Sequence, residues 1–278
     1  MDPKFHMPPP PTTIFKISYP APFVLLITIQ REKQMNSIPL RGHWEGELLL
    51  QWFDSEPELR VAVITGAGNK AFCSGQDLIE QEEFTHNPPH PKERKFAPSG
   101  FCGLSRRGGK KPVIAAVNGY ALGGGFEICL NCDLVVASPT ASFGLPESSI
   151  GVYAAAGGLP RIVRICGMQI AAEIALAGKR LTAHEAKALQ LVNIVTETPE
   201  KLLHEALALA SRVANMSPDA TIVTRAGLRE AWETASVERA CQLTADRYEE
   251  PLLATPNRDI GLRAFKKKQK PNWVPPKL

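Results

Sequence analysis

Two glutamates have neighbours that suit them to acid–base chemistry. Glu127 closely follows the three glycines 123–125 and opens an apolar run, while Glu147 follows a proline and precedes the glycine-bearing stretch AAAGGLPR at 154–161. An acid near a helix N-terminus can serve only to complement the helix dipole, which is worth about 0.3–1 kcal/mol. A second acid in a similar setting favours a functional pair that moves protons.

The glycines 123–125 predict a turn that binds a substrate oxygen. They follow the strand-like PVIAAVN at 112–118 and precede a helix that we expect to begin at about Phe126. The first amides of a helix have no partner within it, and the helix dipole makes this end electropositive. Without Cβ atoms the glycines let a carbonyl group approach, and Glu127, one turn beyond Gly124, would lie beside it.

Other glycine-based chemistry does not match these residues. GGGFE lacks the spacing of a dinucleotide fingerprint, and TGAGNKAFCSG at 65–75 lacks the third glycine of that motif. Neither a phosphate-binding loop nor a G-x-S-x-G nucleophile motif occurs. The sequence therefore favours an oxyanion hole.

A metal site is not expected. Cys129 and Cys132 form a lone C-x-x-C with no second pair and no nearby histidine, so we interpret them as small residues on an inner helix face. His86 and His90 are separated by prolines and have no carboxylate at a matching spacing. We interpret them as solvated loop residues.

Alternating strands and helices must position these residues. We expect a pair of strands within 13–30, broken by prolines, and further strands within 59–68, 111–120 and 132–148. Because strands alternate with helices up to about residue 200, the fold class is α/β. We divide the chain into a disordered proline-rich lead (1–12), a catalytic core (13–216) and a helical segment (217–278).

Composition places the chain among globular proteins, with 44% hydrophobic and 22% charged residues. The net charge of +4 comes from mostly scattered basic residues and gives little support for nucleic-acid binding. No apolar run approaches the length of a membrane span, so no membrane partner is expected. Six cysteines without a secretory signal favour a reducing compartment and free thiols.

Four motifs together resemble one enzyme family. AFCSGQDL at 71–78, AAVNGYALGGGFEICLNCDLVVAS at 115–138, ASFGLPESSIGVYAAAGGLPR at 141–161 and AFKKKQKPNW at 264–273 are similar, in this order, to the crotonase superfamily of enoyl-CoA hydratases and isomerases. The resemblance spans about Thr13 to Trp273. It implies a crotonase-type spiral of ββα turns with a C-terminal helical trimerisation segment, and assembly as a homotrimer or as a hexamer that is a dimer of trimers.

The resemblance also implies a catalytic apparatus. The backbone amides of Gln76 and Gly124 would form the oxyanion hole for a thioester enolate, and Glu127 and Glu147 would share the catalytic water. Retention of both acids favours hydration of a 2-enoyl-CoA, or the reverse dehydration. The acyl-CoA substrate brings the coenzyme A with it, so no separate cofactor is expected.

Coenzyme A contacts are implied by motif position for six residues. Lys33 matches a family lysine near the nucleotide, although REK replaces the usual RPK, and Asp77 is equally well explained as a residue that orders its loop. Phe265 and Lys268 match positions that reach a neighbouring subunit's coenzyme A site. The motif AFCSGQDL adds Ala71 and Phe72.

Two other functions stay open beside the hydratase. The first is an enoyl-CoA isomerase, or a specialised dehydratase of a branched or hydroxylated acyl-CoA. Residues 82–110 favour it, because they are rich in proline, histidine and charge and correspond to the family's acyl pocket, and Tyr153 and Ala154 also depart from the commoner pattern. The second is a non-catalytic binding protein, which the two retained acids disfavour.

The last three residues, Pro276–Leu278, resemble the S-K-L peroxisomal address with proline in place of serine. A proline-rich end would leave the tripeptide accessible. We expect a peroxisomal location on this ground, and a cytoplasmic one otherwise.

Overall fold

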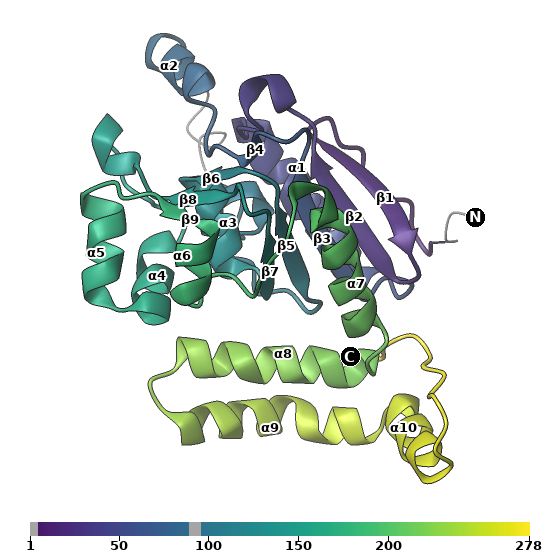
Figure 1. Cartoon of the computed structure of the whole chain (residues 1–278). Coiled ribbons are helices and arrows are strands. Elements are labelled where there is room, and N and C mark those ends of the chain that lie inside the picture. The colour runs from purple at the N-terminus through teal and green to yellow at the C-terminus, as the bar shows by residue number, and fades with distance from the viewer. Residues whose placement is uncertain (1–4, 89–95) are drawn as a thin grey trace.

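The computed structural model describes residues 5–88 and 96–278 of the chain. These residues form a mixed α/β body with a layer of helices below it, as the sequence and the resemblance predicted (Figure 1). The larger sheet of the described chain has the order β1-β2-β3-β5-β7-β10. Its strands are β1 (Phe15–Ala21), β2 (Val24–Ile29), β3 (Val61–Gly66), β5 (Val113–Val117), β7 (Leu134–Ala137) and β10 (Ile194–Val195). Only the β1–β2 pair is antiparallel within it.

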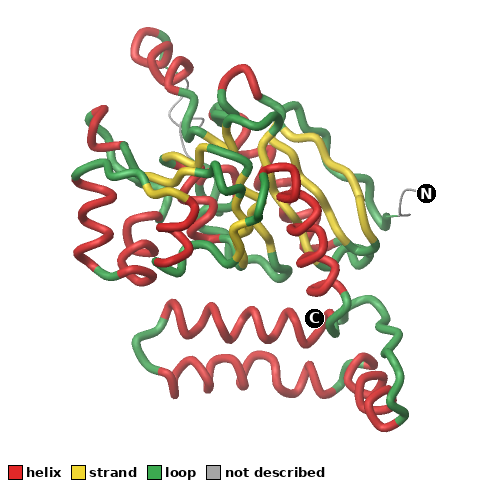
Figure 2. The backbone as a smooth tube through the Cα atoms, in the orientation of Figure 1, coloured by secondary structure: helices red, strands yellow, loops and turns green. Residues whose placement is uncertain are grey.

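The strands of the larger sheet are buried on both faces. Along β2, Val24 and Leu26 pack with α7 (Leu202–Ala214), whereas Leu25 and Ile27 belong to the main core on the opposite face. This alternation follows from the two-residue period of a strand. It explains why the central strands read as unbroken apolar runs. Figure 2 shows α7 lying along the sheet.

A smaller sheet carries the functional loops. It has the order β4-β6-β8-β9, with β4 (Ala71–Cys73), β6 (Tyr120–Leu122) and β8 (Ser142–Gly144) parallel to one another and β9 (Leu181–Thr182) antiparallel to β8. Each of the three parallel strands leads directly to a predicted site residue: β4 to Gln76, β6 to Gly124, and β8 to Glu147. Parallel strands bring their carboxyl ends to one edge, which is where α/β sheets bind ligands.

Six further helices of the described chain belong to the core. Helix α1 begins at Leu40, directly after Pro39, whose fixed φ suits a position at a helix start. Helix α3 begins at Gly124, two residues earlier than the sequence predicted. The set is α1 (Leu40–Ser55), α2 (Leu78–His86), α3 (Gly124–Asn131), α4 (Gly158–Cys166), α5 (Met168–Leu176) and α6 (Ala183–Ala188).

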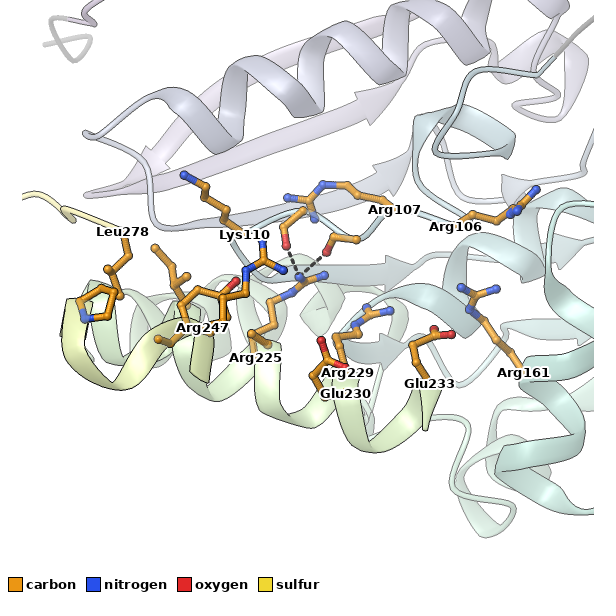
Figure 3. Close-up of a pocket in the computed structure, with 16 residues that line it drawn as sticks. Arg106, Arg107, Lys110, Arg161, Arg225, Arg229, Glu230, Glu233, Arg247 and Leu278 are labelled. Carbon is orange, nitrogen blue, oxygen red and sulfur yellow. Dashed lines mark hydrogen bonds between the residues drawn. The ribbon is translucent and has the colours of Figure 1, made fainter. Parts of the chain in front are cut away.

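Three helices follow the core and lie beneath it in Figure 1: α8 (Pro218–Glu233), α9 (Val237–Leu253) and α10 (Pro256–Lys266). Buried Arg225 on α8 holds this layer to the core, since its Nε lies 3.0 Å from the Asp133 carboxylate and its Nη1 donates to the carbonyls of Gly108 and Gly109. Figure 3 shows the two bonds to the glycine carbonyls in an arginine-lined cavity of about 600 Å³. The inner arginines of that cavity therefore join α8 to the body.

Residues 5–12 belong to the segment 1–12 that the sequence assigned to a disordered lead, and the structure describes them against the body. This segment has neither helix nor strand, but the Phe5 ring packs 4.8 Å from Tyr19 and 5.2 Å from Trp52. The Trp52 indole also donates to the Met7 carbonyl over 2.9 Å. The partly buried Phe5 ring anchors this extended, proline-stiffened segment and helps offset its ordering entropy, and composition alone did not reveal that anchor.

Candidate active site

One cavity of about 680 Å³ brings the predicted catalytic residues together. It lies at the carboxyl edge of the smaller sheet and is lined by Gln76 after β4, by Gly123, Gly124 and Glu127 after β6, and by Glu147 after β8. These residues are far apart in the sequence. The parallel order of β4, β6 and β8 explains why they meet.

The two amides expected to bind the thioester oxygen lie on adjacent loops. Gly75 has φ +100, and a Cβ placed on it would lie 3.5 Å from the Gly124 nitrogen and 3.1 Å from the Leu122 oxygen. The close approach and the left-handed backbone both require glycine there. Neither Gln76 N–H nor Gly124 N–H donates to a group in residues 5–88 or 96–278. Both are available to an oxygen in the cavity.

Glu127 is a buried acid that a backbone amide orients. Only 3% of the residue is exposed, and its Oε1 accepts a 2.8 Å hydrogen bond from Gly158 N–H at the start of α4. The pKa of Glu127 is raised to about 7, chiefly by burial; the Gly158 hydrogen bond opposes the rise, and the Glu147 charge contributes to it. A carboxyl group with this pKa can both give and take a proton near neutral pH.

Glu147 approaches the same space from the opposite loop. It begins a short 3-10 helix, Glu147–Ile150, directly after Pro146. Its Oε1 would lie 3.3 Å from a Cβ on Gly123, and its Oε2 is buried with no partner among the described residues. Burial raises the pKa of Glu147. A buried oxygen without a protein partner is suited to hold a water or a substrate proton.

One wall of the cavity is aromatic, with a hydrogen-bonded pair of polar side chains beside it. Phe96 and Phe101 line it, so residues of the segment 82–110 do contribute a wall, and Tyr153 contributes another. His43 is fully buried behind this wall, with its Nε2 2.8 Å from Gln76 Oε1. Sequence reasoning missed His43, because a lone histidine inside an amphipathic helix carries no motif.

The predicted coenzyme A residues near β4 have structural contacts of their own. Asp77 Oδ2 lies 2.7 Å from Arg31 Nη2, and Oδ1 accepts from Glu80 N–H at the start of α2. Phe72 is fully buried in the core, and the Ala71 carbonyl accepts from the Asn36 amide over 2.7 Å. Lys33 is exposed in the 3-10 helix Glu32–Gln34. Of these four residues, Lys33 alone presents a free charged side chain.

The predicted residues Phe265 and Lys268 lie in the helical layer, away from the cavity of their own chain. Phe265 on α10 is 86% exposed, and Lys268 follows the end of that helix. Figure 1 shows α10 below the body and α2 above it. An effect of these residues on substrate binding therefore requires a second subunit.

No group of three or more histidine, cysteine, aspartate or glutamate side chains within the described ranges could hold a metal ion. Cys129 is buried in α3 and Cys132 caps its end. His86 is exposed, as expected, but it ends helix α2 instead of lying in a loop, and His90 lies outside the described residues. In the described part of the chain, no helix is both long and apolar enough to cross a membrane.

Comparisons with known sequences agree with this geometry. A family model described as enoyl-CoA hydratase/isomerase matches residues 22–275. The mevalonyl-coenzyme A hydratase of Aspergillus fumigatus is 47% identical over 94% of this chain and 95% of its own. That of Beauveria bassiana is 43% identical over 99% of each chain. The carnitinyl-CoA dehydratase of Escherichia coli K12 is 38% identical, over 90% and 94%.

Solved structures agree as well. An enoyl-CoA hydratase from Bacillus anthracis superposes with a TM-score of 0.83 at 31% identity, covering 94% of this chain and 99% of that one. An enoyl-CoA hydratase from Mycobacterium marinum gives 0.84 at 32% identity, covering 94% and 98%.

Proposed function

The chain belongs to the enoyl-CoA hydratase/isomerase family, and on that basis we propose that it adds water to a 2-enoyl-CoA or removes water from a 3-hydroxyacyl-CoA. One observation carries this proposal. Two glutamates whose pKa values are raised by burial line the same cavity as two backbone amides without protein partners. That set provides both proton transfers and the stabilisation of the oxyanion.

In the hydration direction, Glu127 takes a proton from water as the water oxygen bonds to Cβ, and Glu147 gives a proton to Cα. Dehydration reverses both transfers. The amides of Gln76 and Gly124 stabilise the negative charge on the thioester oxygen. One such donor lowers the barrier by about 2.7–4 kcal/mol, and each positioned acid or base contributes about 10²–10⁴-fold in rate.

The physiological substrate is a branched acyl-CoA that carries a distal polar group. Support comes from the relatives named for mevalonyl-coenzyme A and carnitinyl-CoA, and from a cavity in which Gln76 and Arg180 stand among apolar residues. Mevalonyl-CoA, a 3,5-dihydroxy-3-methylpentanoyl thioester, meets this description. The coenzyme A portion enters as part of the substrate, without a separate cofactor.

A panel of acyl-CoAs tests the proposal. We expect mevalonyl-CoA to be dehydrated with a higher kcat/KM than 3-hydroxybutyryl-CoA. Glu127→Gln and Glu147→Gln should each lower kcat about 10²–10⁴-fold. The double variant should lose far less than the product of the two, because the acids act as a unit. Full activity of either variant, or turnover limited to double-bond migration, would exclude the two-acid hydratase mechanism.

We also propose a trimer, in which α10 of one subunit reaches the coenzyme A site of the next. Leu262 and Phe265 on α10 are 57% and 86% exposed, and Lys268 follows them. In that arrangement Phe265 and Lys268 contact the coenzyme A of the neighbouring subunit, and Lys33 contacts its nucleotide part from the same subunit as the cavity. Light scattering on the wild type and on Phe265→Asp tests the assembly, and a monomeric wild type would overturn it.

For location, the tripeptide Pro276–Leu278 supports a peroxisomal proposal. The backbone amides of Lys277 and Leu278 donate to Asp219 Oδ1 over 2.7 and 3.2 Å. A receptor that reads these residues would have to release them from Asp219. Deletion of the tripeptide should leave the protein in the cytosol, and unchanged import after deletion would exclude this signal.

A further inference from the structure

The direction of each hydrogen bond behind the cavity is fixed by one backbone amide. Cys102 N–H can only donate, and it lies 3.0 Å from His43 Nδ1, so Nδ1 must be the unprotonated nitrogen of the ring. Burial lowers the pKa of His43 to about 4, which keeps the imidazole neutral at physiological pH. A neutral ring with unprotonated Nδ1 carries its hydrogen on Nε2.

This tautomer sets the orientation of the Gln76 side chain. His43 Nε2–H lies 2.8 Å from Gln76 Oε1 and donates to it, so the Gln76 oxygen faces the histidine. The amide nitrogen of Gln76, with two N–H donors, then points away from His43. No group in the described parts of the chain accepts a hydrogen bond from that nitrogen, and Gln76 lines the cavity.

Aromatic rings hold this pair in place and keep its surroundings apolar. The His43 ring lies 4.8 Å from the Phe96 ring and 4.7 Å from the Phe101 ring, and both phenylalanines line the cavity beside Gln76. A donor in such surroundings interacts more strongly with a substrate oxygen than it would in water. It also disfavours an alkyl group at the same place, because the N–H groups would lose water without gaining a partner.

We propose that the Gln76 carboxamide selects the acyl group, by donating a hydrogen bond to an oxygen on the distal part of the acyl chain, with His43 as its positioning residue. The inference rests on the proposed function and adds a second role for one residue. Gln76 contributes its backbone amide to the thioester oxygen and its side chain to substrate choice. For mevalonyl-CoA the accepting atom is the C5 hydroxyl oxygen.

A pair of substrates that differ by one oxygen tests the proposal. The measured quantity is the selectivity ratio, kcat/KM for mevalonyl-CoA divided by kcat/KM for its 5-deoxy analogue, 3-hydroxy-3-methylpentanoyl-CoA. We expect Gln76→Met, which has similar length and no N–H, to lower this ratio about tenfold, the value of one hydrogen bond. Any general effect of the substitution on the oxyanion hole cancels in the ratio. A wild-type ratio of one or less, or an unchanged ratio in Gln76→Met, would overturn the proposal.

Two substitutions of His43 form a matched pair. His43→Asn keeps an acceptor for Cys102 N–H but is too short to reach Gln76, whereas His43→Gln can still donate to Gln76. We expect the selectivity ratio to fall in His43→Asn and to be largely restored in His43→Gln, even if both variants lose stability. Equal ratios in the two variants would show that His43 is merely structural. This pair also carries the test if Gln76→Met fails to fold.

Failure of the proposed hydratase function can be distinguished from failure of the proposed Gln76 contact. If neither thioester is turned over by the wild type, the hydratase assignment fails. The ratio of their dissociation constants, measured by calorimetry with wild type and Gln76→Met, then tests the Gln76 contact alone. Tighter binding of mevalonyl-CoA that Gln76→Met removes would support the contact, and equal binding of the two thioesters would exclude it.

Discussion

Gly158 N–H donates a 2.8 Å hydrogen bond to Glu127 Oε1, and a Cβ on Gly158 would lie 2.8 Å from Glu127 Cγ. The first residue of α4 therefore both orients the acid on α3 and leaves it room. This contact joins α3 and α4, although the motif of neither helix indicated in the sequence that it depends on the other. The stretch AAAGGLPR therefore contributes to the candidate active site through the backbone of Gly158, although it supplies no reactive side chain.

Gly158→Ala should displace Glu127 and lower kcat by about tenfold or more, because a shift of about 1 Å in a catalytic group can cost about 100-fold. Overpacking of this buried position should also cost about 1–3 kcal/mol of stability. Gly108→Ala is the matched control, since a Cβ there meets nothing within 4 Å. Steady-state kinetics and urea unfolding measure both effects. Equal kcat in the two variants would contradict the positioning role of Gly158.

The raised pKa of Glu127 predicts how stability depends on pH. A carboxyl group with a pKa of 4.5 when unfolded and about 7 when folded stabilises the native state below pH 4.5. That contribution is lost as pH rises through about 7. Glu127→Gln cannot ionise and still offers an oxygen to Gly158. It should therefore gain up to about 3 kcal/mol over the wild type at pH 8, and little at pH 4.5.

Urea unfolding at the two pH values measures this difference. Glu147→Gln provides a comparison, because the pKa of Glu147 is also raised by burial but the residue is less enclosed. If Glu127→Gln were no more stable than the wild type at pH 8, Glu127 would not be a strained buried carboxylate.

The raised pKa of Glu127 also predicts a pH profile of activity with an alkaline limb. Catalysis in either direction needs one proton on the pair of acids, and that proton is lost as pH rises above about 7. Because burial raises the pKa of Glu127 to about 7, the proton favours Glu127, which is the arrangement that dehydration requires. We expect kcat/KM to fall tenfold per pH unit above about pH 7.5. This alkaline decrease should disappear in Glu127→Gln. A flat profile from pH 6 to 9 would contradict this.

The sequence revealed those parts of the site that depend on local structure. Glycines 123–125 before a helix, and Glu147 after a proline, are recognisable because a turn and a helix start are set by neighbouring residues. The bond between His43 and Gln76 could not be read in this way. It joins helix α1 to the loop after β4, and these two segments are brought together by the bridge between Ile38 and Gln76, which only the folded register supplies.

The start of α8 can be recognised from the sequence, because Ser217 and Pro218 form a helix start in which the Ser217 hydroxyl accepts from Ala220 N–H. What holds that layer to the core was not visible. In the sequence, Arg225 is indistinguishable from the other charged residues of an amphipathic helix. In the structure it is buried, and it contacts Asp133 and the Gly108 and Gly109 carbonyls. Its partners are more than ninety residues away in the chain.

Arg225→Leu should therefore loosen the helical layer. The substitution removes a buried guanidinium and leaves two carbonyls without their donor, so we expect a loss of about 2–4 kcal/mol in unfolding free energy. Asp133 keeps its 3.1 Å contact with Arg229, which limits the damage. Arg247→Leu is the control, because Arg247 lines the same cavity but is exposed, and it should change stability by less than about 0.5 kcal/mol (Figure 3). Urea unfolding followed by circular dichroism measures both variants, and equal midpoints would show that Arg225 does not anchor α8.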